Sequence, residues 1–423
     1  MKAAACRLRI CGANPHFIAG GYAACDESPE RTLRAARRSL SLRIFYAKGQ
    51  KSMKKIISVI TAFLTTIGFC FTCHAAPEDI SAYSAVVINA DTGEILFEKN
   101  AHEQRAIAST TKIMTTLLTI EAGQPDRLFT VDSMAIRVEG TSMGLQEGDI
   151  VSRRALCYGM LLPSGNDAAN AAAVSVSGSM NAFADIMNRK AAEIGMENTH
   201  FVNPSGLDAE GHYSTAYDMA LLTRYAMKND EFSRICASSS ASLEYGNPPY
   251  RRTLYNSNKL LSQYDGCIGV KTGFTDDARR CLVSAAERDG KTVIAVTLNA
   301  PDDWSDHAQL LDYGFSQLTS YEISPESFTI PVFGSETHDI RISPERNASV
   351  GLGEKEQQYV SIEYHIPRFA YAGIYKGEQL GTAKIYYKNT EVASIPMLAE
   401  SACIRKTPEK DVFGQIMEIF GIS

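Results

Sequence analysis

Residues 108–114 read Ala-Ser-Thr-Thr-Lys-Ile-Met and place the hydroxyl of Ser109 three positions before the ammonium of Lys112. The apolar residues from Ile113 to Ile120 recur at helical spacing. Side chains three positions apart share one face of a helix, so Ser109 and Lys112 are expected to meet. A lysine with a lowered pKa can take the proton that makes serine nucleophilic. Taken alone, the stretch also fits an ordinary helix start with a solvated lysine.

Two further short motifs follow the first in a fixed order. Residues 164–166 read Ser-Gly-Asn and residues 271–273 read Lys-Thr-Gly. Each alone predicts no more than a turn or the end of a strand. Together they supply a second hydroxyl, an amide and a second lysine, which are different parts of one acyl-transfer reaction. Two lysines at one site lower each other's pKa, and this gives a base that works near neutral pH without histidine.

With these motifs the chain resembles the low-molecular-mass penicillin-binding proteins of the D-alanyl-D-alanine carboxypeptidase type, the serine peptidases of family S11. The resemblance runs from about residue 83 to about residue 396. It also rests on residues 88–93, 161–169, 198–207 and 215–218. It implies an enzyme that removes the terminal D-alanine from peptidoglycan stem pentapeptides through an acyl-enzyme and is acylated by β-lactam antibiotics. No cofactor is implied.

The resemblance assigns a role to each motif residue. Ser109 is the nucleophile, Lys112 receives its proton, and Ser164 passes a proton to the leaving group. The residues expected to bind substrate are Asn166, Lys271, Thr272, Gly273 and Phe274. Within this set, Asn166 holds the substrate amide, Lys271 and Thr272 attract its carboxylate, and Gly273 permits close approach. The backbone N–H groups of Ser109 and Phe274 are expected to form an oxyanion hole.

One departure from the family pattern concerns the substrate carboxylate. Some members use an arginine before the last helix of the first domain, whereas residues 302–307 here read Asp-Asp-Trp-Ser-Asp-His. Arg279 and Arg280 are the candidates to replace it, and Trp304 is expected to pack. The eight histidines show no metal-binding spacing, so no metal site is expected.

Charge and targeting signals bear on location and partners. Residues 1–75 hold 12 of the 42 basic and 3 of the 48 acidic residues, which leaves 30 against 45, a net charge of −15, for the remainder. An acidic body argues against nucleic acid as a partner. Residues 53–76 have the basic start, apolar run and small-residue boundary of a signal peptide, so a secreted protein at the outer face of the membrane or in the cell wall is expected. Residues 1–52 are interpreted as an upstream extension that is not part of the natural product.

The mature chain is expected to hold two domains. Residues 77–318 mix helices with antiparallel hairpins, which predicts an α+β domain with a sheet covered by helices, as in β-lactamases and transpeptidases. Within it, residues 236–265 are expected to be irregular. Residues 319–403 predict a small all-β domain. Residues 404–423 predict an amphipathic helix that either packs on protein or lies on a membrane surface. Five cysteines at wide spacings indicate free thiols.

Two alternatives remain open at this point. A class A-like β-lactamase shares the three motifs but needs a carboxylate on a loop, for which Glu197 and Asp208 are the candidates. The sequence of residues 198–207, which resembles that of the carboxypeptidases, and the C-terminal β domain favour the carboxypeptidase instead. The second alternative is a catalytically idle wall-binding scaffold of the same fold, and the presence of all the reactive side chains argues against it.

Overall fold

The computed structural model describes residues 76–405 of the chain. The expectations for residues 1–52, for the signal peptide at 53–76 and for the terminal helix at 404–423 fall almost entirely outside this range. Among the described residues, no helix has the length and apolar character needed to cross a bilayer.

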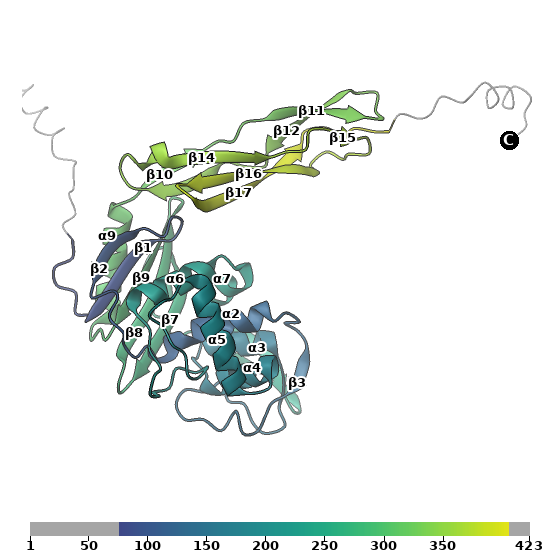
Figure 1. The fold of residues 1–423 in the computed structure, drawn as a ribbon. Helices are drawn as coiled ribbons and strands as arrows, with labels where there is room; N and C mark the ends of the chain where they lie inside the picture. Colours follow the sequence, from purple (N-terminus) through teal and green to yellow (C-terminus); the bar gives the residue numbers. More distant parts are fainter. Residues whose placement is uncertain (1–75, 406–423) are drawn as a thin grey trace, which may run out of the picture. The chain divides into compact units, whose positions relative to one another are not determined.

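A five-stranded antiparallel sheet in the order β2-β1-β9-β8-β7 forms the centre of the first domain (Figure 1). Its first two strands come from the start of the domain and its other three from the end, and β1 pairs with β9 along its whole length. The strands are β1 (Ser84–Asn89), β2 (Ile95–Lys99), β7 (Cys267–Thr275), β8 (Arg279–Arg288) and β9 (Lys291–Leu298). This topology joins residues about 200 positions apart in one sheet.

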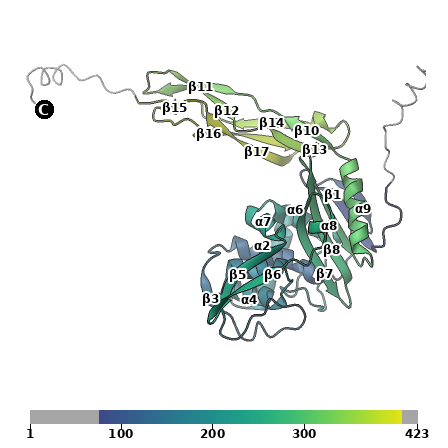
Figure 2. The same cartoon turned by 180° about the vertical axis from the view of Figure 1, so that it is seen from behind.

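Both faces of this sheet are covered, which explains why β1 is buried at all six positions. Alternate side chains of a strand point to opposite faces. Val86 and Ile88 belong to the core under the helix cluster, whereas Ala85 and Val87 belong to the core under helix α9 (Asp303–Ser316). Figures 1 and 2 show α9 along one face and most of the other helices gathered beyond the opposite face.

The helix cluster carries the motif residues. Its members are α2 (Lys112–Glu121), α3 (Arg153–Leu161), α4 (Asn166–Ser177), α5 (Met180–Ile194), α6 (Ala216–Met227) and α7 (Asp230–Cys236). The short α8 (Leu260–Gln263) lies on the α9 side, because Leu260 belongs to the same core as Leu310 and Leu311. Side-chain caps define several starts, because Ser152, Ser179 and Thr215 each accept a hydrogen bond from the backbone N–H three residues later. The antiparallel pair β3 (Leu128–Thr130) and β4 (Ile150–Ser152) lies between α2 and α3 in the sequence.

The second domain is all β among its described residues, apart from a 3₁₀ turn at Glu356–Tyr359. A six-stranded sheet in the order β14-β16-β17-β12-β11-β15 is accompanied by the pair β10-β13. The strands are β10 (Thr319–Ile323), β11 (Phe328–Phe333), β12 (Asp339–Pro344), β13 (Ala348–Leu352), β14 (Val360–His365), β15 (Ala370–Tyr371), β16 (Gln379–Tyr387) and β17 (Thr390–Ala399). The predicted fold class, an α+β domain followed by a small all-β domain, is confirmed.

The prediction that residues 236–265 are irregular is wrong. They contain the hairpin of β5 (Ser240–Gly246) and β6 (Pro249–Tyr255), which pair in full register (Figure 2). The alternation of exposed and half-buried positions is present, but the residues are mostly polar, and the turn at Asn247-Pro248 lacks the usual hairpin signal. A polar two-stranded ribbon therefore gave no apolar pattern to detect.

The five cysteines between residues 76 and 405 are free thiols. Four are buried, and burial raises the pKa of Cys236 and of Cys281 to about 12. A thiol with so high a pKa is mostly protonated at neutral pH and therefore a poor nucleophile.

Candidate active site

Ser109, the predicted nucleophile, lies on a tight turn rather than inside a helix. Ala108–Thr111 form a 3₁₀ turn, and α2 begins at Lys112. The apolar residues after Lys112 anchor this turn, because Ile113, Met114 and Leu117 are fully buried in the core beneath it. Lys112 itself has no exposed surface, whereas Ser109 is half-buried at the pocket.

Three acceptors surround the amine of Lys112. Its Nζ lies 2.8 Å from Ser109 Oγ, 2.7 Å from Asn166 Oδ1 and 2.6 Å from the carbonyl oxygen of Ser205. The amide orientation of Asn166 is fixed, because its Nδ2 donates to the carbonyl oxygen of Glu139 at 2.7 Å. Two of the three partners, Asn166 Oδ1 and the Ser205 carbonyl, can only accept.

This arrangement determines where a neutral amine directs its lone pair. Neutral Lys112 has two hydrogens, and the two pure acceptors take both. The lone pair then faces Ser109 Oγ, whose hydroxyl can donate to it. The geometry is that of a base poised to remove the serine proton.

The electrostatics favour the neutral amine. Burial, and then the positive charge of Lys271, hold the pKa of Lys112 well below its ordinary value, and the charge of Asp167 opposes them. Burial lowers the pKa of Lys271 to about 7. Both lysines are almost completely buried, at 0% and 1% exposure. Near neutral pH the site therefore holds fewer positive charges than two ordinary lysines would.

The Lys-Thr-Gly motif runs along the edge strand β7. Lys271 Nζ donates to the carbonyl oxygen of Thr272 at 2.8 Å, and the Thr272 hydroxyl lies 2.9 Å from that of Ser257. A Cβ atom added at Gly273 would lie 3.2 Å from the backbone nitrogen of Ser109. Only glycine lets the strand come this close to the nucleophile turn without a shift of the neighbouring atoms.

A pocket of about 500 Å³ opens above these groups. Its lining includes Ser109, Ser164, Asn166, Thr272, Gly273 and Phe274, together with Ser257, Lys259, Arg280, Asp303 and Trp304. The two motif lysines lie beneath the surface of the pocket, where they contact its lining residues. The structure thus brings all three motifs to one cavity. Between Lys112 and Ser164, no direct side-chain hydrogen bond is formed in this part of the chain.

Comparison with known proteins gives the family. A family model for D-alanyl-D-alanine carboxypeptidase, peptidase family S11, matches residues 71–302. The chain belongs to this family. A second model, for the C-terminal domain of penicillin-binding protein 5, matches residues 318–403. The predicted family is therefore confirmed, and the protein is a hydrolase of the peptidase class.

The chain is similar to several curated members. D-alanyl-D-alanine carboxypeptidase DacF of Bacillus subtilis is 32% identical over 367 residues, which cover 82% of this chain and 94% of that protein. DacD of Escherichia coli is 29% identical over 364 residues, covering 81% and 91%. The crystal structure of the Streptomyces K15 DD-transpeptidase superposes with a TM-score of 0.55 at 34% identity and covers 57% of this chain and 99% of its own. DacD from Francisella tularensis covers 80% of this chain, with a TM-score of 0.54 at 28% identity.

The comparisons confirm the carboxypeptidase interpretation, and nothing in them favours a β-lactamase or an idle scaffold. The two carboxylates considered for the lactamase are not part of the pocket lining. Asp208 accepts a hydrogen bond from Thr275 Oγ1 at 2.7 Å, and Glu197 is exposed.

One of the two candidate arginines lies at the pocket. Arg280 on β8 lines the pocket and donates from Nε and Nη2 to Asp303 Oδ1, at 3.0 and 2.7 Å. Its guanidinium carbon lies 5.8 Å from the centre of the Trp304 ring. Arg279 is exposed and does not line the pocket. Of the two arginines considered from the sequence, only Arg280 can therefore meet a substrate there.

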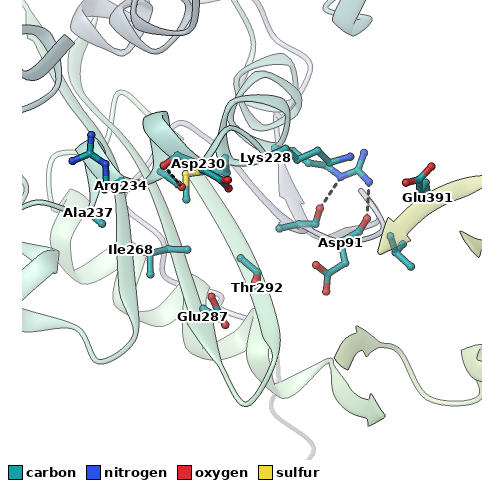
Figure 3. Close-up of a pocket in the computed structure, with 14 residues that line it drawn as sticks. Asp91, Lys228, Asp230, Arg234, Ala237, Ile268, Glu287, Thr292 and Glu391 are labelled. Atoms are coloured by element: carbon teal, nitrogen blue, oxygen red, sulfur yellow. Dashed lines mark hydrogen bonds between the residues drawn. The ribbon is translucent and has the colours of Figure 1, made fainter. Parts of the chain in front are cut away.

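A larger hollow of about 600 Å³ is lined by 14 residues, half of which are charged (Figure 3). Arg224 donates to the carbonyl oxygens of Ala90 and Asp91 at 2.7 and 2.6 Å. Burial raises the pKa of the Asp91 carboxyl to about 6. None of the motif residues lines this hollow, so its greater volume does not make it the site of acyl transfer.

Sequence reasoning missed Asp167, which organises the loop opposite the nucleophile. Its carboxylate accepts hydrogen bonds from the backbone N–H groups of Met143, Gly144 and Leu145, and from the hydroxyl of Ser142. The side chain is 2% exposed. A buried carboxylate in a ring of donors was invisible in the sequence because its partners are mostly backbone groups some 20 residues earlier.

We expect Asp167→Asn to destabilise the protein by about 2–4 kcal/mol, because the new amide NH₂ would face donors and leave them unpaired. Chemical denaturation of the variant measures the loss. Asp185→Asn is the matched control, since Asp185 is exposed on α5 and should change stability little. An unchanged midpoint for Asp167→Asn would show that the ring of donors contributes nothing.

His212, which lies outside the three motifs, is a structural element of the site. Its Nδ1 accepts from the backbone N–H of Val202 at 3.1 Å, which leaves Nε2 to carry the proton. Nε2 lies 2.9 Å from Thr111 Oγ1, in the turn that bears the nucleophile. His212 therefore joins that turn to the segment that leads to Ser205, whose carbonyl oxygen contacts Lys112.

Burial lowers the pKa of His212 to about 4. An unfolded histidine titrates near 6.5, so the native state resists protonation, and stability present above pH 6.5 is lost as pH falls toward 4. We expect the loss from His212 to be at most about 3 kcal/mol. His212→Gln should flatten the stability curve in this window, as measured by denaturation at pH 7, 5.5 and 4.5. Buried His307, with a pKa of about 3, makes stability depend on pH in the same direction. The contribution of His212 is therefore the difference between the curves of variant and wild type. Parallel curves for the two proteins would contradict the assignment.

Proposed function

We propose that this family member is a serine-type D-Ala-D-Ala carboxypeptidase that trims peptidoglycan stem pentapeptides and is acylated by penicillins. The observation that carries the proposal is the set of contacts around Lys112, where two pure acceptors leave the lone pair of the neutral amine for Ser109. The activity for which the family is named supports the same substrate.

In the acylation step, Ser109 Oγ attacks the carbonyl carbon of the penultimate D-alanine as its proton passes to Lys112. The oxyanion that forms accepts hydrogen bonds from the backbone N–H groups of Ser109 and Phe274. Such donors are typically worth about 2.7–4 kcal/mol each. Collapse of this intermediate breaks the C–N bond, and the leaving D-alanine amine takes the proton held by Lys112 by way of the Ser164 hydroxyl. Water then attacks the ester carbonyl carbon as Lys112 takes one of its protons, and that proton passes to Ser109 Oγ when the ester C–O bond breaks.

Substrate binding is assigned to the opposite walls of the pocket. Asn166 faces the substrate amide, and Gly273 lets the β7 backbone lie alongside the peptide. Lys271 and Thr272 attract the terminal carboxylate. Arg280 is a third hydrogen-bond donor for this carboxylate, beside Lys271 and Thr272, and its ion pair with Asp303 fixes its position.

The proposal is tested by incubating residues 77–423 with a fluorescent penicillin and with a D-Ala-D-Ala pentapeptide. We expect a covalent adduct on Ser109, seen by peptide mass spectrometry, and release of free D-alanine. Ser109→Ala should abolish both. Surviving turnover in Ser109→Ala would place the nucleophile elsewhere, and rapid loss of the penicillin without D-alanine release would favour a β-lactamase.

We also propose that residues 53–76 are a cleaved signal peptide and that the enzyme works outside the cytoplasm, with residues 404–423 on the membrane surface. The action of family members on the cell wall supports an extracytoplasmic location. N-terminal sequencing of the mature protein tests cleavage, and a start before residue 76 would contradict it.

A further inference from the structure

The wall of the pocket beside β8 contains Trp304, the only tryptophan in the chain. Trp304 lies in the first turn of α9 and is half-buried. Part of its side chain packs against the core beneath α9, as the sequence led us to expect, but the residue also lines the pocket. The indole is therefore available to contact a bound molecule.

Two cations hold the indole ring in place. The guanidinium carbon of Arg280 lies 5.8 Å from the ring centre, and Nζ of Lys259 lies 5.9 Å from it. A cation within about 6 Å of an indole is attracted to its face. Arg280 is fixed in turn by its hydrogen bonds to Asp303, the residue that precedes Trp304. The ring is thus a preorganised wall beside a group that can bind a carboxylate.

The strand register places Arg280 beside the threonine of the Lys-Thr-Gly motif. Arg280 pairs with Phe274 and Leu282 pairs with Thr272, so Thr272 and Arg280 are diagonal neighbours on adjacent strands. Directly paired residues, and residues two apart on a strand, have their side chains on the same face of a sheet. This face is the one that α9 covers, because Leu282 belongs to the core beneath α9 (Figure 2). Thr272, Arg280 and Trp304 therefore surround one end of the pocket.

We propose that Trp304 contacts the side chain of the terminal residue that is cleaved off, and that this contact selects D-alanine at that position. The inference rests on the proposed function, which places the terminal carboxylate at Thr272 and Arg280. A single carbon atom separates that carboxylate from the methyl group of D-alanine, so the methyl group must lie beside the same wall. The other residues of this wall are polar, namely Ser257, Lys259 and Asp303. The indole is the apolar surface of this wall against which the methyl group is removed from water.

Phe274 is the other aromatic residue of the pocket lining and offers an alternative contact. It is 60% exposed, so most of its surface faces solvent. Trp304 is half-buried and lies against Arg280, the carboxylate-binding group. The geometry therefore favours Trp304, and Phe274 provides the matched comparison for a test.

The test compares kcat/KM for three peptides that end in D-Ala-D-Ala, D-Ala-Gly and D-Ala-D-Leu. The wild type should prefer D-Ala-D-Ala to D-Ala-Gly by about 10–200-fold, the usual effect of one methylene in an apolar site. In Trp304→Ala this preference should fall about tenfold, and kcat/KM for D-Ala-D-Leu relative to D-Ala-D-Ala should rise about tenfold, because the vacated space admits a larger side chain. Partial unfolding cannot produce this result, since it lowers all three rates equally.

Two further variants make the comparison specific. Trp304→Phe keeps an apolar ring and should keep most of the preference for D-Ala-D-Ala. Phe274→Ala should affect all three peptides alike, so that both ratios stay near their wild-type values. Wild-type ratios in Trp304→Ala, or a loss of the preference in Phe274→Ala instead, would overturn the proposal.

Binding without turnover separates this proposal from the catalytic one. Trp304 is the only source of indole fluorescence, so a D-Ala-D-Ala pentapeptide added to Ser109→Ala should shift the emission, while calorimetry measures binding independently. Binding with unchanged emission would overturn the role of Trp304 and leave the proposed function intact. A shift of emission in Ser109→Ala, with no release of D-alanine by the wild type, would support the contact and overturn the proposed reaction.

Discussion

Replacing Lys112 with alanine is expected to slow acylation of Ser109 by a penicillin about 10²–10⁴-fold, the usual contribution of a positioned general base. The amine is the only group among the described residues that contacts Ser109 Oγ through a side-chain hydrogen bond. Its removal leaves the serine hydroxyl with no acceptor for its proton. The measurement is the rate of adduct formation with a fluorescent penicillin, followed by gel or mass spectrometry.

The control for this variant is Lys228→Ala. Burial also lowers the pKa of Lys228, but this lysine lines the hollow of Figure 3 and has no contact with Ser109. It should acylate at the wild-type rate. Because Lys112→Ala leaves Asn166 Oδ1 and the Ser205 carbonyl unpaired, its thermal unfolding must be recorded as well. Added small primary amines should restore part of the rate in a folded variant, and a wild-type rate without them would show that Lys112 is not the base.

The sequence predicted those parts of the site that follow from local spacing. Ser109 and Lys112 lie three positions apart and do meet, although on a 3₁₀ turn that runs into α2 and not on a continuous α-helix. Ala108, the first residue of this turn, has a positive φ of 47°.

The sequence could not predict the contacts that backbone groups make at long range. The carbonyl oxygen of Ser205 contacts Lys112 across 93 residues, and any residue type could have provided it. Gly206 makes that approach possible, because a Cβ there would lie 2.0 Å from the carbonyl oxygen of Ala108. Arg280 and Asp303 form a pair between β8 and α9 that only the folded sheet brings together. Such partners become visible when the topology is known.

Lys271 provides the second large effect, because it acts on both the substrate and the base. We expect Lys271→Gln to lower kcat/KM for a D-Ala-D-Ala peptide about 10²-fold, through loss of the charge that attracts the terminal carboxylate. The same change removes the positive charge that helps to lower the pKa of Lys112. That pKa therefore rises, although burial, the larger cause, is unchanged. A larger fraction of Lys112 is then protonated at neutral pH. The acid limb of the pH–rate profile for acylation, where the rate rises as Lys112 loses its proton, must therefore move to higher pH.

Two matched variants separate these effects. Thr272→Ala removes a hydrogen-bond donor to the carboxylate on the same strand but no charge, so kcat/KM should fall while the acid limb stays in place. Lys271→Arg keeps the charge and should also leave the limb near its wild-type position. The measurement is the pH dependence of penicillin acylation and of D-alanine release for all four proteins. If Lys271→Gln loses activity with no upward movement of the acid limb, Lys271 binds substrate without tuning Lys112, and the coupling of the two lysines inferred from their burial in one site is wrong.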